Sequence, residues 1–331
     1  MIISRTPFRI SFFGGGTDYP IWYNDHGGAV INATINKYCF ITVRNLPPFF
    51  KYKHRIRYYL HEETNTLDEI KHPSVRECSK YLNIDNGIEM VHNADLPAQS
   101  GLGSSSTFTV GLLNSLHALQ NYMPAKRELA LDAIHVEQNL IHENVGSQDQ
   151  TAAAFGGFNK ITFSGVNIIE IEPIIISKER LSMLQDNLLL FFTGFARNAS
   201  EIAQKQIEVT PKKEKELHTM MDICKEALQY LVNNNRSLDE FGKLLDKQWK
   251  IKRGLTNKIT NNEIDSIYSA GIKAGALGGK LLGAGGGGFM LFYVPKHKQK
   301  SVKEVLKSKL LVPFNFEFTG SKIIYFSHQD N

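Results

Sequence analysis

The segment Pro97-Ala-Gln-Ser-Gly-Leu-Gly-Ser-Ser-Ser106 places two glycines and three serines directly ahead of an amphipathic stretch. Apolar residues recur at helical spacing from Phe108 to Leu119, which predicts a helix over residues 104–120. Glycines let a backbone approach a ligand closely, and a helix N-terminus offers free N–H groups with a partial positive charge. The segment therefore predicts a cradle for phosphate, with a serine-capped helix after a tight turn as the alternative.

The cradle differs from the common phosphate-binding loop GxxxxGK[ST], because no lysine follows its second glycine. Serine hydroxyls can supply further hydrogen bonds or bind magnesium. The candidate phosphate-binding residues are Gly101, Leu102, Gly103, Ser104, Ser105 and Ser106.

A second glycine-rich segment, Gly283-Ala-Gly-Gly-Gly-Gly-Phe289, runs straight into a predicted strand over residues 289–294. Four consecutive glycines cost considerable folding entropy, so they indicate backbone packed against backbone or against a ligand. Gly285 and Gly286 are the candidates for ligand contact. A flexible surface hairpin is the alternative.

The third segment, Gly146-Ser-Gln-Asp-Gln150, is expected to form a loop after a helix that ends near His142. A carboxylate held beside a phosphate site can orient and deprotonate an attacking hydroxyl, as phosphoryl transfer requires. Asp149 is therefore a candidate general base, and a role in a turn or helix cap is the alternative.

The length of 331 residues favours two domains, with a boundary between about 165 and 195. Hydrophobic periodicity predicts strands and helices mixed along the chain. The further predicted strands cover residues 2–3, 9–13, 29–43, 168–176, 188–192 and 322–326, and the further predicted helices cover 126–142, 212–232, 238–249, 263–274 and 302–310.

The composition is that of an ordinary globular protein with a mild formal net charge of +5. This charge favours anionic ligands without singling out nucleic acid, although the basic and aromatic segment 51–59 resembles a nucleic-acid surface; a solvated edge strand is the preferred interpretation. Cys39, Cys78 and Cys224 have no metal-type spacing and are expected to be free thiols. With no signal-type start and no apolar run of roughly 20 residues, a cytoplasmic protein without membrane contact is expected.

Taken together, the motifs resemble those of the GHMP kinases, the family that includes galactokinase, homoserine kinase and mevalonate kinase. The matching segments are Pro7 to Tyr19, Pro97 to Ser106 and Lys280 to Phe289, so the resemblance covers almost the whole chain. It implies a kinase that uses ATP and Mg²⁺, with the active site between two domains. The implied fold class is α+β, with a ribosomal protein S5 domain 2-like domain over residues 1–180 and a ferredoxin-like domain over residues 181–331; the strands and helices predicted above agree with it.

The resemblance also assigns roles to individual side chains. Asp149 lies in a G-x-x-D-Q segment that matches the catalytic segment of galactokinases, which implies that it is the catalytic base. Arg9 matches the basic residue of the first motif, which lies near that aspartate and screens the phosphoryl charge. Ser105 and Glu137 match the magnesium ligands of the family.

The expected sugar-binding turn departs from that of galactokinases. They have G-E-H-T-D-Y where this chain has Gly14-Gly15-Gly16-Thr17-Asp18-Tyr19. Asp18, which matches the acceptor for sugar hydroxyls, is retained. The two glycines that replace the acidic and imidazole side chains, Gly15 and Gly16, remove negative charge and open volume, which favours a larger or anionic sugar next to Thr17.

This pattern is similar to that of kinases of D-glycero-D-manno-heptose 7-phosphate within the family. The similarity implies phosphorylation of the C1 hydroxyl to give the 1,7-bisphosphate, a precursor for GDP-heptose and surface polysaccharide. The substrate's own phosphate needs a cation, and Arg197, in a loop between a buried strand and a helix, is the candidate. An exposed loop arginine is the alternative.

Other functions stay open at this point. A kinase of an unphosphorylated sugar of the fucose or galactose type would share every catalytic residue named above. A catalytically silent GHMP-fold protein could bind sugar and nucleotide as a regulator, although Asp149 and the loop serines are all present. A nucleic-acid-binding protein depends on the 51–59 segment alone.

Overall fold

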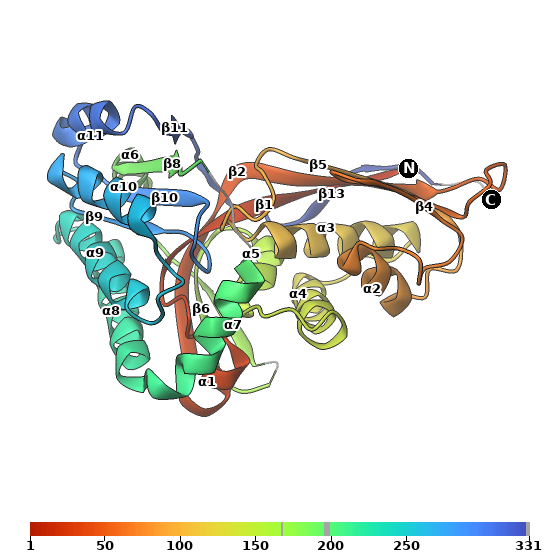
Figure 1. Ribbon diagram of the computed structural model, residues 1–331, viewed down its shortest axis with the longest axis horizontal. Helices are drawn as coiled ribbons and strands as arrows, with labels where there is room; N and C mark the ends of the chain where they lie inside the picture. The colour runs from red at the N-terminus through yellow and green to blue at the C-terminus, as the bar shows by residue number, and fades with distance from the viewer. Residues whose placement is uncertain (167, 195–198, 329–331) are drawn as a thin grey trace.

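The computed structural model describes residues 1–166, 168–194 and 199–328, and it has two antiparallel-rich sheets with helices packed on them (Figure 1). The larger sheet has nine strands in its described part and runs in the order β13-β1-β2-β5-β3-β4, with β6 and β12 pairing with β2 and β7 pairing with β6. The smaller sheet has four strands in the order β11-β8-β10-β9. The N-terminal part (residues 1–173) builds most of the larger sheet, and the C-terminal part (residues 178–311) builds the smaller one.

The larger sheet is built around two long strands that are buried along much of their length. Its strands are β1 Ile2–Phe13, β2 Gly28–Asn45, β3 His54–Arg57, β4 His61–Thr64, β5 Ile88–Ala94, β6 Phe158–Phe163, β7 Ile169–Pro173, β12 Phe316–Glu317 and β13 Lys322–Phe326. One face is covered by helices, as Figure 1 shows for α2, α3 and α4. These helices and their neighbours are α1 Pro20–His26, α2 Pro73–Tyr81, α3 Ser104–Leu119, α4 Lys126–His135, the π-helical turn Val136–Leu140 and α5 Gln148–Phe155.

The C-terminal part carries most of the remaining helices. Its strands are β8 Leu188–Phe192, β9 Gly278–Leu281, β10 Phe289–Tyr293 and β11 Leu310–Leu311. Its helices are α6 Lys178–Asp186, α7 Ala199–Val209, α8 Glu214–Val232, α9 Asp239–Arg253, α10 Asn262–Lys273 and α11 Gln299–Val305, with short 3₁₀ turns at Thr210–Lys212 and Lys296–Lys298. This arrangement confirms the predicted α+β class.

Some predicted elements differ from those in the structure. The predicted helix over residues 302–310 is wrong at its end, because α11 stops at Val305 and Leu310–Leu311 instead forms β11, which pairs with the edge of β8. Near the C-terminus, β12 pairs with β2 and β13 pairs with β1. The last strands therefore complete the larger sheet, and the domain boundary at residue 180 stays a prediction.

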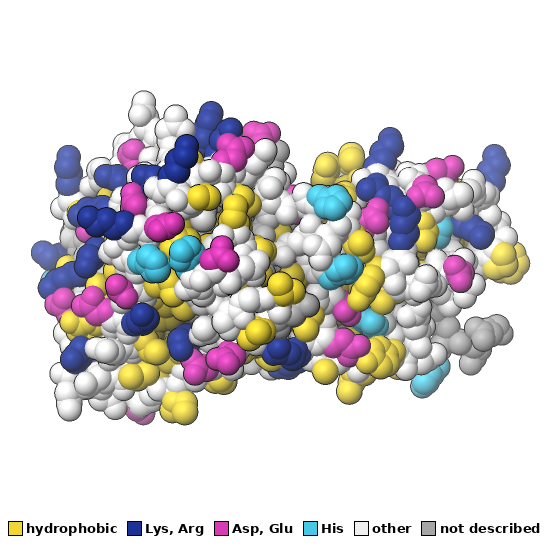
Figure 2. All heavy atoms as spheres, turned by 90° about the horizontal axis from the view of Figure 1, so that it is seen from below, with side chains coloured by type: hydrophobic (Ala, Val, Ile, Leu, Met, Phe, Trp, Pro, Cys, Tyr) yellow, Lys and Arg dark blue, Asp and Glu magenta, His cyan; other side chains and the backbone are white. Residues whose placement is uncertain are grey.

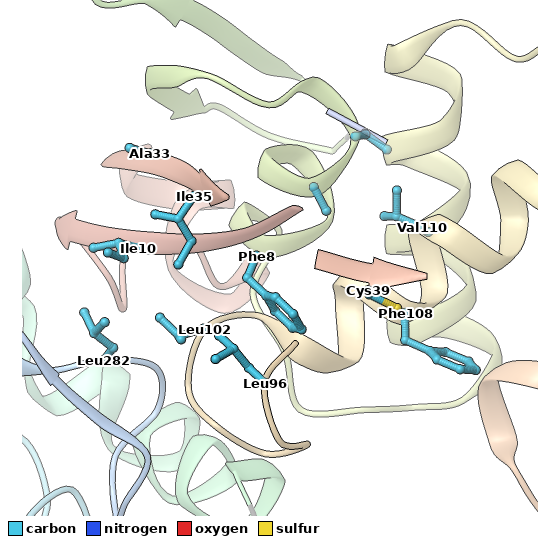
Figure 3. Packing of buried hydrophobic residues seen from close by; sticks show 14 of the residues in the cluster. Phe8, Ile10, Ala33, Ile35, Cys39, Leu96, Leu102, Phe108, Val110 and Leu282 are labelled. Carbon is cyan, nitrogen blue, oxygen red and sulfur yellow. The ribbon is translucent and has the colours of Figure 1, made fainter. Parts of the chain in front are cut away.

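The two parts of the chain share their hydrophobic cores. The ring of Phe241 on α9 lies edge-on to Phe12 and Phe13 of β1, with centroids 5.5 and 4.9 Å apart. In Figure 3, Leu282 of the C-terminal part lies next to Ile10 and Leu102 of the N-terminal part, within one buried cluster. Burial of apolar surface stabilises a folded protein by about 25 cal/mol per Å². The core shared by the two parts therefore resists their separation and keeps the loops of both parts in fixed positions.

Surface features agree with the modest net charge. Dark-blue Lys and Arg side chains are interspersed with magenta Asp and Glu on the face in Figure 2. Within the basic segment 51–59, Arg55 is paired with Glu89 at 2.9 Å and lies over the ring of Phe50. The three cysteines are buried and free, as predicted. Across the described residues, every helix is too short or too polar to span a bilayer.

Candidate active site

A cavity of about 350 Å³ lies where the two parts meet, and all three sequence motifs reach it. The two glycine-rich loops touch there: a Cβ on Gly101 would lie 2.4 Å from the Leu282 carbonyl oxygen, and a Cβ on Gly283 would lie 2.5 Å from Gly101 Cα. Both glycines also have positive φ, +79° and +76°. Only glycine fits this contact of backbone with backbone. At the end of the run 285–288, Gly288 packs in the same way, since a Cβ there would lie 2.2 Å from the Ser100 carbonyl oxygen.

The phosphate loop passes into α3 through Gly103, which has a left-handed φ of 78°. The loop glycines and the three serines line the cavity, so the free N–H groups at the start of α3 face it. Leu102 instead has its side chain fully buried in the core, while its carbonyl accepts from the Arg9 N–H at 3.1 Å. Leu102 thus anchors the loop, and the glycines and serines around it form the cradle.

A two-point ion pair stands beside this cradle. Arg9 Nε donates to Asp149 Oδ1 at 2.7 Å, and Arg9 Nη2 donates to Asp149 Oδ2 at 2.6 Å. Arg9 Nη1 also donates to the Gly101 carbonyl at 2.9 Å, which ties the pair to the phosphate loop. Asp149 lies in the first turn of α5 and not in a loop, a difference from the prediction that gives its carboxylate a fixed direction.

The sugar-binding turn predicted from sequence lies next to the ion pair. Asp18 is buried, and its two carboxylate oxygens accept from Gly16 N at 2.8 Å and from Gln148 Nε2 at 2.9 Å. Burial raises the pKa of Asp18, and the nearby Asp149 adds to this effect, against the opposing hydrogen bond from Gly16. A Cβ at Gly146 would lie 2.0 Å from Asp18 Oδ2, so the glycine that opens the G-x-x-D-Q segment makes room for Asp18.

The other residues of the turn either line the cavity or stabilise the turn itself. Gly15, Gly16 and Asp18 line the cavity. Thr17 is fully buried, and its hydroxyl donates to the Gly14 carbonyl at 2.8 Å, so it closes the turn from behind.

The predicted metal ligands are placed differently from one another. Glu137 lies in the π-helical turn after α4, buried, and accepts from Ser106 Oγ at 2.7 Å and from Gln150 Nε2 at 2.5 Å. Ser106, and not Ser105, therefore contacts Glu137, while Ser105 is exposed on the cavity wall. Burial raises the pKa of Glu137 to about 7.

This arrangement suits a hard cation such as Mg²⁺. Glu137 Oε1 is buried and has no hydrogen-bond partner among the described residues, so one carboxylate oxygen is left for a ligand. Residues 1–166, 168–194 and 199–328 contain no group of three His, Cys, Asp or Glu side chains that could bind a metal without further ligands. Mg²⁺ commonly uses one or two carboxylates together with hydroxyls, waters and substrate phosphates, so the donor set present fits it.

Two other predicted residues, Gly285 and Gly286, do not line the cavity. Gly285 packs against Ile259, since a Cβ there would lie 2.7 Å from Ile259 Cα. Gly286 N donates to the Ile259 carbonyl at 2.9 Å. Gly283 and Ala284 line the cavity in their place. Arg197 lies outside the described residues.

An aromatic end of the cavity was missed from the sequence. His72 stacks on Phe108 at 4.6 Å, while Tyr58 and His92 lie edge-on to these rings. Burial lowers the pKa of His72 to about 4 and lowers that of His92, so both imidazoles are neutral at neutral pH. The uncharged aromatic wall suits a flat ring. Its residues come from separate elements, so no local sequence pattern marks them.

Two polar residues of the C-terminal part were also missed. Lys252 on α9 lines the cavity, and its Nζ donates to the Gly283 carbonyl at 2.5 Å. Gln206 on α7 is buried against Gly16, and its Nε2 has no hydrogen-bond partner among the described residues. The sequence did hold a signal for Lys252, because it continues the buried spacing of Phe241, Leu245 and Gln248.

Comparisons with known proteins agree with this geometry. Residues 70–157 match the model for the GHMP kinases N terminal domain, and residues 224–311 match the model for the GHMP kinases C terminal domain. D-glycero-alpha-D-manno-heptose 7-phosphate kinase from Campylobacter jejuni is 30% identical over 96% of this chain and 96% of the relative. Galactokinase from Pyrococcus furiosus is 25% identical over 96% of this chain and 95% of the relative.

A solved structure has the same fold. The crystal structure of a D-glycero-D-manno-heptose 1-phosphate kinase from Bacteroides thetaiotaomicron superposes with a TM-score of 0.74 at 23% identity, covering 99% of this chain and 100% of that one. The paired family models cover the phosphate loop, Asp149 and the second glycine loop, and the relative at 30% identity matches 96% of the chain. This chain therefore belongs to the GHMP kinase family of phosphotransferases.

Proposed function

We propose that this protein is a sugar kinase that transfers the γ-phosphoryl group of ATP to the C1 hydroxyl of D-glycero-D-manno-heptose 7-phosphate, giving the 1,7-bisphosphate. The observation that carries the proposal is the position of Asp149, held by Arg9 at the junction of the phosphate loop and the sugar-binding turn. A carboxylate at that junction can contact an acceptor hydroxyl and face the group to be transferred.

The reaction needs little covalent chemistry from the protein. The Asp149 carboxylate accepts the C1 hydroxyl proton while the hydroxyl oxygen attacks the γ-phosphorus and the bond from that phosphorus to the bridging oxygen of ADP breaks. Arg9 orients Asp149, and Asp18 accepts a hydrogen bond from another hydroxyl of the sugar. The N–H groups at the start of α3 receive the phosphate chain.

ATP fits the cavity from its aromatic end. The adenine ring would lie against Tyr58, His72 and Phe108, which are uncharged at neutral pH and close to the phosphate loop. Mg²⁺ would be held by Glu137 with the serines of the loop, and when bound it would neutralise charge on the phosphate oxygens.

Three features support the heptose phosphate over a smaller, neutral sugar. The full-length relative at 30% identity is named for that substrate. Galactokinases carry an acidic side chain in this turn, and its negative charge would repel a substrate phosphate. The glycines at positions 15 and 16 of this chain remove that side chain. The buried amide of Gln206 lies against Gly16 of the sugar-binding turn, where its unpaired N–H donor could bind a substrate phosphate.

A substrate panel tests the proposal. The purified protein, ATP and MgCl₂ are incubated with D-glycero-D-manno-heptose 7-phosphate, the unphosphorylated heptose, L-fucose and D-galactose, and ADP release is followed. We expect the highest kcat/KM with the heptose 7-phosphate and a new anomeric phosphate signal by ³¹P NMR. A higher kcat/KM for an unphosphorylated sugar would contradict the substrate assignment, and no turnover of any sugar would favour a silent binding protein.

A further inference from the structure

Lys252 is a buried lysine that lines the cavity. It lies near the end of α9, is only 5% exposed, and donates from Nζ to the Gly283 carbonyl at 2.5 Å. An ammonium group carries three N–H bonds, and Gly283 is the one hydrogen-bond acceptor that the described structure provides for Lys252. Burying such a group without full partners is costly, so its retention needs a reason.

The neighbouring cations have their donors engaged by the protein. Arg9 forms its two-point pair with Asp149 and also donates to the Gly101 carbonyl. Lys280 on β9 is 1% exposed and donates to the Ser11 and Phe12 carbonyls, which fixes the end of β1. Arg9 thus uses three of its five N–H bonds and has its charge paired with Asp149, and Lys280 uses two of its three. Among the described residues, Lys252 keeps two of its three N–H bonds for a ligand and forms no ion pair with a carboxylate.

The position of Lys252 defines which part of a ligand it can reach. Its acceptor, Gly283, packs directly on Gly101 of the phosphate loop. Its electrostatic neighbours are Asp18, Arg9 and Asp149, which come from the sugar-binding turn, β1 and α5. Lys252 thus stands between the cradle for the phosphate chain and the carboxylate that faces the acceptor hydroxyl, where the transferred group must pass.

We propose that Lys252 is a catalytic residue whose ammonium group donates hydrogen bonds to an oxygen of the phosphoryl group during its transfer. The proposal rests on the proposed kinase function, but not on which sugar is the acceptor. Negative charge spreads over the phosphoryl oxygens in the transition state, and a preorganised donor in a dry site stabilises that charge. The two unshared N–H bonds of Lys252 meet this requirement.

The ionisation of Lys252 agrees with this role and supplies a second readout. Burial lowers the pKa of Lys252 to about 8, with Asp18 and Asp149 opposing the shift and Arg9 adding to it. The amine of Lys280, whose pKa is itself lowered by burial, lies close to it as well. In the free enzyme the ammonium form is therefore lost as the pH rises through about 8, and bound phosphate favours the ammonium form.

The test compares Lys252→Met with Lys247→Met, an exposed lysine on the same helix. In the full-length protein, Lys252→Met should lower kcat by roughly 100-fold or more, as removal of an oxyanion donor does, with a much smaller rise of about threefold to tenfold in KM for ATP. Lys247→Met should behave as wild type. The fall of kcat/KM above pH 8 in wild type should be absent from the residual activity of Lys252→Met.

Binding separates this role from a structural one. Lys252→Met should bind ADP as wild type does, while its affinity for the analogue AMP-PNP, which retains a γ-phosphoryl group, should fall at least threefold. Lys252→Gln, whose amide keeps two N–H donors without the charge, checks against misfolding. A wild-type kcat in Lys252→Met, or equal losses of ADP and AMP-PNP affinity, would overturn the proposal. If no sugar is phosphorylated, the kinase assignment fails, and the AMP-PNP comparison still decides whether Lys252 contacts the γ-phosphoryl group.

Discussion

The Arg9–Asp149 pair joins two residues that are 140 positions apart in the sequence. Each carboxylate oxygen of Asp149 accepts one N–H of a planar guanidinium, so the pair fixes orientation as well as charge. The carboxylate is therefore already held in one rotamer when a substrate hydroxyl binds. The sequence indicated both residues through separate motifs, but their two-point contact depends on β1 and α5 being adjacent.

Removing the base tests this arrangement. Asp149→Asn should lower kcat by at least about 10²-fold, because an amide cannot accept the hydroxyl proton, whereas ATP affinity should stay within a few fold. Steady-state kinetics together with ATP titration measure the two effects. Glu143→Gln, at another carboxylate on the cavity wall, is the matched control. Turnover near the wild-type level in Asp149→Asn would remove it from the role of base.

Glu137 gives a second residue-scale prediction, on stability. The pKa of Glu137 is raised to about 7 in the folded state, so its stabilising contribution is present at acidic pH and is lost as pH rises through about 7. The neutral variant Glu137→Gln should therefore be more stable than wild type at pH 8 without metal, by about 1–3 kcal/mol, and the difference should shrink toward pH 5.

Thermal unfolding between pH 5 and 8 measures this difference, with the exposed Glu170→Gln as control. MgCl₂ with ATP should raise the Tm of wild type more than that of Glu137→Gln, since the variant lacks the anionic ligand. A stability difference that does not change with pH would contradict the raised pKa, and equal shifts with MgATP would place the metal elsewhere.

At the scale of elements, the site is made where ends of strands and helices converge. The phosphate loop lies between β5 and α3, the sugar-binding turn follows β1, and Asp149 begins α5. Local sequence predicted the phosphate loop with its helix and the turn after β1, because turns and helix starts have compositional signals. It placed Asp149 in a loop instead of in α5. It did not predict the aromatic end of the cavity, since Tyr58, His72 and His92 contribute through tertiary contacts alone. The π-helical turn that carries Glu137 also lacked a local signal.

The contact between the two glycine loops is testable at one position. Gly283→Ala puts a Cβ 2.5 Å from Gly101 Cα at a φ of +76°, so either the backbone strains or the phosphate loop moves. We expect a loss of about 1–3 kcal/mol in stability and a rise of tenfold or more in KM for ATP. Gly254→Ala, at an exposed glycine with a φ of −83°, is the control and should change neither quantity appreciably. An unchanged KM for ATP in Gly283→Ala would show that the loop contact does not set the cradle.

At the scale of the whole molecule, the fold class was predicted from the family resemblance, and the order of predicted strands and helices agreed with it. The strands β8 and β13 were predicted at their observed bounds. The return of β12 and β13 to the first sheet could not be predicted, because pairing between residues some 280 to 320 positions apart depends on the assembled core. The same applies to Phe241, whose helical spacing predicted burial but not its contacts with Phe12 and Phe13. Two parts that share cores in this way should not unfold independently.

The two tryptophans offer a direct test of that cooperativity, since Trp22 lies in the N-terminal part and Trp249 in the C-terminal part. Both are almost fully buried, so each reports on the packing around it. The variants Trp22→Phe and Trp249→Phe each leave one tryptophan. Urea unfolding curves from tryptophan fluorescence are compared with those from circular dichroism of the same samples. We expect fluorescence and circular dichroism to give coincident midpoints within each variant, because one buried cluster contains both tryptophans. Comparing probes within a variant removes the effect of the substitution on stability. A Trp249 signal that is lost before the circular dichroism changes would mean that the C-terminal part unfolds alone, and that the cavity opens without global unfolding.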